Sequence, residues 1–224
     1  MIYNELQKRI ISSIILIPIT FFLIIKGSLI FTIFLVFFFL ISSYEWINLN
    51  KNFIVKIIGI IYLFLSSFIA FLLRDSFSYE IFILIIVICI STDLGGYFFG
   101  KIFKGPKLTK ISPKKTYSGV VGSFIFSLIF AILYKNSSFF NLSTNINLPI
   151  FNENELYYKI FFIVFVLIIS LFSQLGDLLI SYFKRLSNVK DTGKLIPGHG
   201  GLLDRVDGII FAIPTSYLIL INLN

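Results

Sequence analysis

The chain has 224 residues, of which 57% are hydrophobic and only 13% are charged. A soluble domain carries about 25% charged residues, so the composition excludes an ordinary soluble protein and predicts a polytopic membrane protein. The formal net charge of +8 is compatible with nucleic-acid binding. Basic loops that set the membrane topology explain the charge better, and we expect a lipid bilayer and no nucleic acid as partner.

Apolar stretches separated by short polar segments predict an all-α fold, a bundle of about seven transmembrane helices. Most of these stretches approach the ~17–25 residues that a membrane helix needs. The whole chain, residues 1–224, is expected to form a single integral membrane domain. The expected spans are residues 10–25, 28–43, 57–73, 81–99, 120–134, 160–183 and 209–223.

The distribution of cations between the loops predicts the orientation. If the N-terminus is cytoplasmic, almost all of the 19 Lys and Arg fall on the cytoplasmic side. By the positive-inside rule, this predicts a multi-pass protein of a bacterial inner membrane with loops 100–119 and 184–208 in the cytoplasm and residues 136–158 outside. The four cations that would lie on the outer side are Lys26, Arg74, Lys135 and Lys159.

A polar stretch, residues 181–207, contrasts with its almost purely apolar flanks. Carboxylate oxygens are preferred ligands of Mg²⁺, and Lys and Arg neutralise phosphate oxygens, so the stretch predicts a metal and phosphate site. Three glycines between Pro197 and Gly201 allow the backbone to turn sharply beside a ligand. The charged residues of this stretch are Lys184, Arg185, Lys190, Asp191, Lys194, Asp204, Arg205 and Asp207, and His199 is the only histidine of the chain.

Two more carboxylates, Asp93 and Asp177, lie inside expected membrane spans. An unpaired carboxylate at that depth costs at least ~2.5–3.5 kcal/mol, so each is a functional candidate, although a structural partner for a buried lysine remains an alternative for Asp93. Asp177, Ser181 and Lys184 are spaced to share one helix face that leads toward the cytoplasmic loop. Asp204 and Asp207 are three residues apart and should also share a face.

The residues from Ser181 to Asp207 fit the pattern S-x-x-K-R-x4-K-D-x-G-x-x-x-P-G-H-G-G-x-x-D-R-x-D at every fixed position. This pattern resembles the signature of bacterial phosphatidate cytidylyltransferases, also called CDP-diacylglycerol synthases. The resemblance extends to Asp93, within a D-x-G-x-Y-x-x-G-K/R pattern, and to the segment around Ser112, which is similar to an I-S-P-x-K-T-x-E-G element. It covers residues 93–207 strongly, whereas the N-terminal third matches in hydropathy, an early KRI element and Glu45-Trp46.

The resemblance implies that CTP and phosphatidate are converted to CDP-diacylglycerol and diphosphate. It places the catalytic core within residues 81–224, after N-terminal helices in residues 1–80. It also implies a magnesium cofactor, with a second cation and a homodimer left open. The metal is assigned to Asp177 and Asp204, with Asp207 next and Asp93 as a further candidate.

Two groups of residues are expected to carry the reaction. For the Lys and Arg residues in these groups, anchoring of the helix ends at lipid headgroups is the alternative interpretation. The catalytic candidates are Asp177, Lys184, Asp204, Arg205 and Asp207. The substrate-binding candidates are Ser112, Lys115, Thr116, Ser181, Arg185, Lys190, Asp191, His199, Gly200 and Gly201.

Departures from the family pattern concern acidic groups. Ser118 and Ile180 stand where the family commonly has Glu, and Gly208 replaces a frequent Ser. The loss of two acidic groups is expected to weaken a second cation site or to alter substrate fit, but every signature carboxylate is present.

Two other functions compete with this interpretation. A CTP-dependent kinase of a membrane lipid alcohol would need a base for the hydroxyl group, which the sequence does not clearly offer. An ion-coupled transporter would place its carboxylates at mid-bilayer between repeats, whereas here the polar groups cluster at the cytoplasmic face and no inverted repeat is visible.

Overall fold

The computed structural model describes residues 18–109, 112, 115–137, 156–195 and 200–222. Within these ranges the named elements are all helices, and Lys107 and Thr116 form an isolated β-bridge, so the all-α prediction is confirmed. Residues 18–26 are also helical. The named helices are α2 (Ser28–Leu49), α3 (Phe53–Ser76), α4 (Tyr79–Phe103), α5 (Tyr117–Lys135), α6 (Leu156–Leu186), α7 (Leu203–Val206) and α8 (Ile209–Ile221).

Five helices of the described chain, α2 to α6, are long and apolar enough to cross a membrane. They coincide with five of the expected spans, so the multi-pass character is confirmed. The helix α8 has 13 residues, or about 20 Å at 1.5 Å per residue, which is short for a hydrocarbon core of ~30 Å. Most of the expected span 10–25 lies outside the described residues, and the total of about seven spans stays a prediction.

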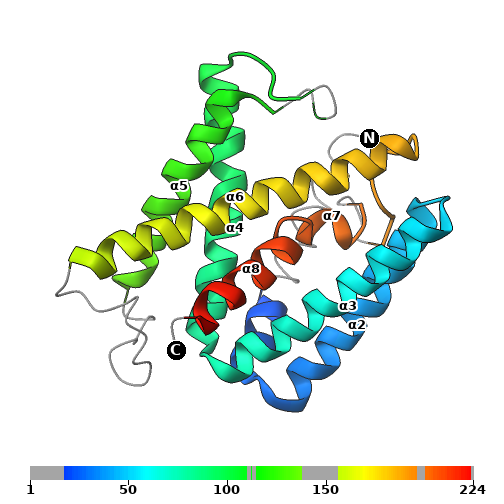
Figure 1. Cartoon of the computed structure of the whole chain (residues 1–224), viewed down its shortest axis with the longest axis horizontal. Helices are drawn as coiled ribbons and strands as arrows, with labels where there is room; N and C mark the ends of the chain where they lie inside the picture. Colours follow the sequence, from blue (N-terminus) through cyan, green and yellow to red (C-terminus); the bar gives the residue numbers. More distant parts are fainter. Residues whose placement is uncertain (1–17, 110–111, 113–114, 138–155, 196–199, 223–224) are drawn as a thin grey trace.

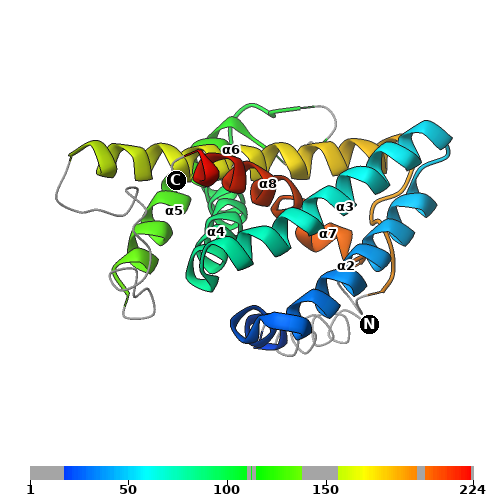
Figure 2. The same ribbon diagram turned by 60° about the horizontal axis from the view of Figure 1, so that its bottom comes forward.

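The helices pack as two antiparallel pairs joined by α6 and α8. The pair α4–α5 stands on one side of the molecule and the pair α2–α3 on the other (Figure 1). The long α6 crosses the molecule, and α8 lies between α6 and α3 (Figure 2). Buried side chains from α2 to α6 and from α8, among them Phe31, Leu73, Ile81 and Phe165, form the main core.

Two hydrogen bonds show which helix ends lie next to each other. Ser187, just after α6, donates a hydrogen bond to the carbonyl of Leu49 at the end of α2. At the other side of the molecule, the Tyr134 hydroxyl near the end of α5 donates to the Glu80 carbonyl at the start of α4, at 3.3 Å. The ends of α2 and α6 therefore lie close together, and the orientation of the chain in the membrane stays a prediction.

Glycines allow α4 and α5 to approach each other closely. A Cβ atom added to Gly95 would lie 2.3 Å from the Gly122 carbonyl oxygen, and one added to Gly122 would lie 2.3 Å from Phe99. Small residues at membrane helix contacts permit this approach, which matters because lipid offers no hydrophobic driving force for helix association. The same two helices supply much of the candidate site.

We predict that Gly122→Val separates α4 from α5 and lowers the free energy of unfolding by ~1–3 kcal/mol, the usual cost of overpacking. Val121, on the same helix and 56% exposed, provides the matched control. Thermal unfolding of purified protein in detergent measures both variants. Equal melting temperatures for Gly122→Val and Val121→Leu would contradict the close packing.

Candidate functional site

A cavity of about 290 Å³ opens between α4, α5 and α6. It combines two carboxylates, one ammonium group and several hydroxyl groups. The predicted residues Asp93, Ser112, Lys115, Thr116 and Asp177 all line it. Residues from three parts of the sequence therefore meet in one site. The other lining residues are Thr92, Gly96, Tyr97, Gly119, Val120, Ser123 and Gln174.

An ion pair crosses this cavity. The Nζ of Lys115 lies 2.5 Å from Oδ2 of Asp177, and both side chains are about a quarter exposed. Ser181, one turn after Asp177 on α6, donates to Oδ1 of Asp177 at 3.3 Å. The predicted alignment of Asp177 and Ser181 on one helix face is thus present in the structure.

The loop before α5 places Lys115 by backbone hydrogen bonds. Leu108 N–H donates to the Lys115 carbonyl at 2.8 Å, and Lys115 N–H donates to the Ser112 carbonyl at 3.0 Å. Thr116 then caps α5, since its Oγ1 accepts from Gly119 N–H at 3.1 Å. Thr116 and Gly119 line the cavity, so the N-terminus of α5 lies against it, and the positive end of the helix dipole favours an anion there.

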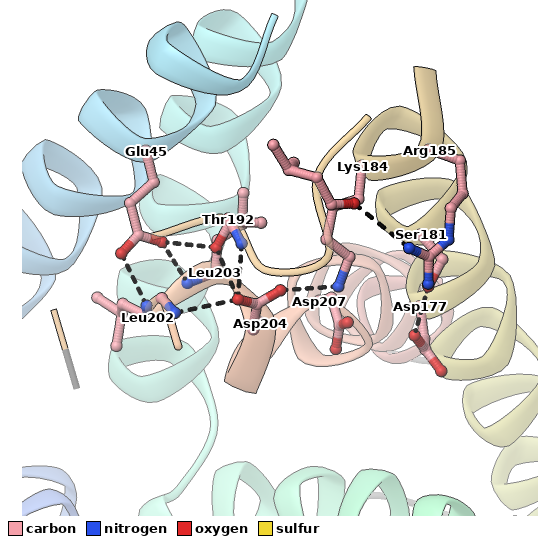
Figure 3. A network of polar contacts seen from close by, with 12 residues as sticks. Glu45, Asp177, Ser181, Lys184, Arg185, Thr192, Leu202, Leu203, Asp204 and Asp207 are labelled. Atoms are coloured by element: carbon pink, nitrogen blue, oxygen red, sulfur yellow. Dashed lines mark hydrogen bonds and ion pairs between the residues drawn. The ribbon is translucent and has the colours of Figure 1, made fainter. Parts of the chain in front are cut away.

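A second polar cluster surrounds Asp204 on α7 (Figure 3). Oδ1 of Asp204 accepts from Nζ of Lys184 at 2.7 Å, and the two side chains are only 7% and 11% exposed, respectively. Oδ2 accepts from Thr192 N–H at 2.8 Å, from Thr192 Oγ1 at 3.1 Å and from Gly201 N–H at 3.0 Å. Asp204 thus ties the end of α6 to the loop that follows it.

Asp207 lies between the two clusters. Its side chain is buried, and its Oδ1 accepts from Gly208 N–H at 3.0 Å. Burial raises the pKa of Asp207 well above the usual range, and the charges of Asp177 and Asp93 raise it further, against the opposing effects of Lys184 and the Gly208 hydrogen bond. The three carboxylates therefore influence one another, which favours a positive charge among them.

The remaining candidates lie around these clusters. Arg185 and Lys190 are exposed, and Arg185 donates to the Val189 carbonyl at 3.4 Å. Arg205 is exposed on α7. A Cβ atom on Gly200 would lie 2.9 Å from Oδ2 of Asp204 and 3.2 Å from Asp191, so this glycine lets the backbone approach both carboxylates. His199 lies outside the described residues.

The expectation of a three-carboxylate metal cage stays a prediction. Across the described residues, no group of three or more His, Cys, Asp or Glu is close enough to hold a metal ion. Asp177 and Asp204 instead belong to different ion pairs, with Lys115 and with Lys184. The two ion pairs are nevertheless close in the chain, because Asp177 and Lys184 lie two turns apart on α6.

Two polar residues of the site did not figure among the sequence candidates. Gln174, one turn before Asp177 on α6, lines the cavity, and its buried Nε2 has no hydrogen-bond partner among the described residues. Glu45 is buried in α2 and accepts hydrogen bonds from the loop and helix around Asp204. A carboxylate in an apolar span was a sufficient signal for Glu45, whereas the role of Gln174 depends on the packing of three helices.

Comparison with known proteins is consistent with this mixture of carboxylates and cations. The model of the cytidylyltransferase family matches residues 48–223, which include both clusters apart from Glu45. The chain belongs to the cytidylyltransferase family. It is therefore a nucleotidyltransferase, and the polar cavity lies in the part that the family shares.

Two relatives from Rickettsia align with nearly the whole chain, and one from Bacillus subtilis aligns with part of it. The phosphatidate cytidylyltransferase of Rickettsia felis is 36% identical over 221 residues, which is 96% of this chain and 92% of the relative. That of Rickettsia conorii is 36% identical over 225 residues, 98% of this chain and 93% of the relative. The enzyme of Bacillus subtilis is 38% identical over 135 residues, 60% of this chain and 45% of the relative.

The two departures from the family's acidic pattern have local explanations. Ile180 is 5% exposed and packs with Trp46, Leu203 and Ile210 in a second apolar cluster, where a carboxylate would be buried without an evident partner. Ser118 is hydrogen-bonded both to Thr116 and to the carbonyl of Lys104, so it stabilises the loop before α5.

Substitution of Lys184 or Lys115 should show how much each ion pair contributes to the free energy of unfolding. We predict that Lys184→Met lowers the free energy of unfolding by about 3 kcal/mol, because it leaves the buried Asp204 without its cation. Lys115→Met should change it by about 1 kcal/mol or less, because that pair is partly exposed and screened. Denaturant titration in micelles measures both, and a larger effect for Lys115→Met would contradict the assigned burial.

Proposed function

We propose that this protein transfers a cytidylyl group from CTP to phosphatidate and so forms CDP-diacylglycerol and diphosphate. The observation that carries this proposal is the cavity in which Lys115, Asp93, Asp177 and the N-terminus of α5 converge. The Lys115 ammonium group and the positive end of the α5 dipole suit a polyphosphate, and carboxylates suit the divalent ion that accompanies it. The relatives from Rickettsia are named for this reaction.

The reaction needs alignment and charge neutralisation more than proton transfer. A phosphate oxygen of phosphatidate forms a bond to the α-phosphorus of CTP, and the bond from that phosphorus to the bridging oxygen of diphosphate breaks. The nucleophile is already an anion near neutral pH. The residues of the site therefore act by holding two anions together and by stabilising the charge that develops on diphosphate.

The cations have distinct positions for this task. Lys115 lies inside the cavity and can leave Asp177 for a phosphate oxygen. Arg205 is exposed on α7, in the same short helix as Asp204. Lys184, held by Asp204, supplies a fixed positive charge between the two clusters. Charge-assisted hydrogen bonds of this type are about twice as strong as neutral ones.

The carboxylates of the cavity fit a magnesium ion. Magnesium is usually bound by one or two carboxylates, with waters and substrate phosphates as its other ligands, so Asp177 and Asp93 form a sufficient protein donor set. Asp207 adds negative charge nearby. When bound, the ion would offset the repulsion between the two anionic substrates. Asp204, with both oxygens occupied by donors, remains a proposed ligand only if Lys184 or the Thr192 loop releases it.

The competing functions are less well supported by the site. A lipid-alcohol kinase needs a base beside a hydroxyl group, and Asp177 of the cavity is paired with Lys115 instead. An ion-coupled transporter needs a site near the middle of the bilayer. The cavity lies against the loop that precedes α5 and the last part of α4, at the end of the bundle.

Both soluble substrate and lipid reach such a site if it faces the cytoplasm. The proposed orientation has a cytoplasmic N-terminus, about seven spans and the loops 100–119 and 184–208 at the inner surface of a bacterial cell membrane. The cation distribution of the loops and the grouped ends of α2 and α6 support it.

We predict that purified protein forms CDP-diacylglycerol from labelled CTP, phosphatidate and Mg²⁺, and that Asp177→Asn lowers kcat/KM by ~10²-fold or more. The amide keeps the shape of the side chain but loses the charge that binds the cation and balances Lys115. Raised Mg²⁺ or Mn²⁺ should partly restore turnover. Product is measured by extraction of labelled lipid.

Asp75→Asn, at an exposed position near the end of α3, serves as the control and should retain wild-type turnover. Absence of lipid product from the wild-type protein would refute the proposed function. Normal turnover of Asp177→Asn at low Mg²⁺ would place the metal elsewhere.

Cysteine labelling tests the orientation. In a Cys89→Ala background, Lys107→Cys should resist an impermeant thiol reagent on intact spheroplasts, whereas Asn136→Cys should react. Both positions are exposed in the structure, so accessibility depends on the membrane side alone. The reverse labelling pattern would invert the proposed topology.

A further inference from the structure

We propose that Glu45 of α2 is a positioning residue for nucleotidyl transfer, because it fixes the loop and short helix that carry Asp204. This inference rests on the proposed function. Glu45 lies just before residues 48–223, which match the family model, and in the last two turns of α2. Its carboxylate is 4% exposed.

Hydrogen bonds explain why the carboxylate is buried. Oε1 accepts from Leu202 N–H at 2.9 Å, and Oε2 accepts from Leu203 N–H at 2.9 Å and from Thr192 Oγ1 at 3.0 Å (Figure 3). Leu202 and Leu203 begin α7, whose first N–H groups have no acceptor within the helix. Glu45 therefore caps α7 from a different helix, and its negative charge stabilises that end.

Thr192 connects Glu45 to Asp204. Its Oγ1 lies 3.0 Å from Oε2 of Glu45 and 3.1 Å from Oδ2 of Asp204, and its N–H also donates to Oδ2 of Asp204 at 2.8 Å. A hydroxyl group has a single proton, so the two carboxylates share one donor. A displacement of Glu45 therefore changes the hydrogen bonding of Asp204, and through Asp204 the position of Lys184.

Two glycines of the signature make room for this arrangement. A Cβ atom on Gly193 would lie 2.7 Å from Oε1 of Glu45, and one on Gly201 would lie 2.5 Å from Oε2 of Glu45 and 2.2 Å from Thr192 Oγ1. Such distances are too short for any side chain. Gly201, which the sequence suggested for substrate binding, thus has a role in admitting Glu45 to the loop.

The packing of α2 does not depend on Glu45 alone. The ring of the adjacent Trp46 contacts Phe183 of α6, with centroids 4.8 Å apart, and Trp46 and Leu49 belong to the apolar cluster that includes Leu203. We therefore expect variants of Glu45 to remain folded. Their effect should appear in the chemical step, because a misplacement of about 1 Å near a reacting centre costs ~10²-fold.

The experiment compares Glu45→Gln, Glu45→Ala, Thr192→Ser and Thr192→Val in the full-length protein. We expect kcat to fall about 10-fold in Glu45→Gln, which keeps one acceptor oxygen, and ~10²-fold in Glu45→Ala, with KM for CTP within about twofold of wild type. Thr192→Ser should retain turnover and Thr192→Val should lose it. The double variant Glu45→Ala/Thr192→Val should be no worse than Glu45→Ala alone, because both act through one network.

Matched controls are Glu80→Gln, in the first turn of α4, and Thr215→Val, whose hydroxyl donates within α8 to the Phe211 carbonyl at 2.9 Å. Both should keep wild-type kcat. Hydrogen exchange provides a readout independent of activity, and the amides of residues 200–206 should exchange faster in Glu45→Ala than in wild type.

The outcomes separate the inference from the function on which it rests. An inactive wild-type protein would refute the nucleotidyl transfer and with it the role of Glu45. An active wild type, with folded Glu45→Ala that turns over at the wild-type kcat, would overturn the positioning role alone. Lowered stability with unchanged kcat would likewise reduce Glu45 to a structural residue.

Discussion

The cost of placing charge in an apolar protein governs the organisation of this molecule. Among the described residues, the charged groups around Asp204 and Glu45 are compensated by donors or by an opposite charge. Asp204 has Lys184 and the N–H groups of Thr192 and Gly201. Glu45 has the N–H groups of Leu202 and Leu203, and the two carboxylates share the Thr192 hydroxyl. Removal of a partner from such a group costs several kcal/mol, so the polar network fixes the relative positions of α2, α6 and α7.

The site follows from this constraint. One cluster is closed, since the oxygens of Asp204 and Glu45 are occupied by protein donors. The other is open, since Asp177 and Lys115 meet in a cavity and remain partly exposed. A closed cluster provides rigidity, and an open one provides groups that can exchange partners with a ligand. Lys184 pairs with Asp204 of the closed cluster and lies two turns after Asp177 of the open one on α6.

Close helix packing complements the polar network. Gly95 and Gly122 bring α4 and α5 together, and Gly176 of α6 leaves room for the backbone of Asp207. A Cβ atom on Gly176 would lie 2.5 Å from the Asp207 carbonyl oxygen. Because lipid does not drive helices together, such contacts and the buried hydrogen bonds determine how the carboxylates are placed.

The sequence by itself determined the membrane class, five of the spans and the family resemblance. Long apolar runs and a signature with many fixed positions are local patterns, and they can be recognised without knowledge of the tertiary structure. Asp177, Lys115, Ser112 and Thr116 were candidates from sequence, and the structure brings them to one cavity. Only the tertiary structure decided that Asp177 and Asp204 belong to different ion pairs, that Gln174 lines the cavity, and that Glu45 holds α7. These relations join residues far apart in the chain, and the helix crossings that create them depend on packing that no local pattern encodes.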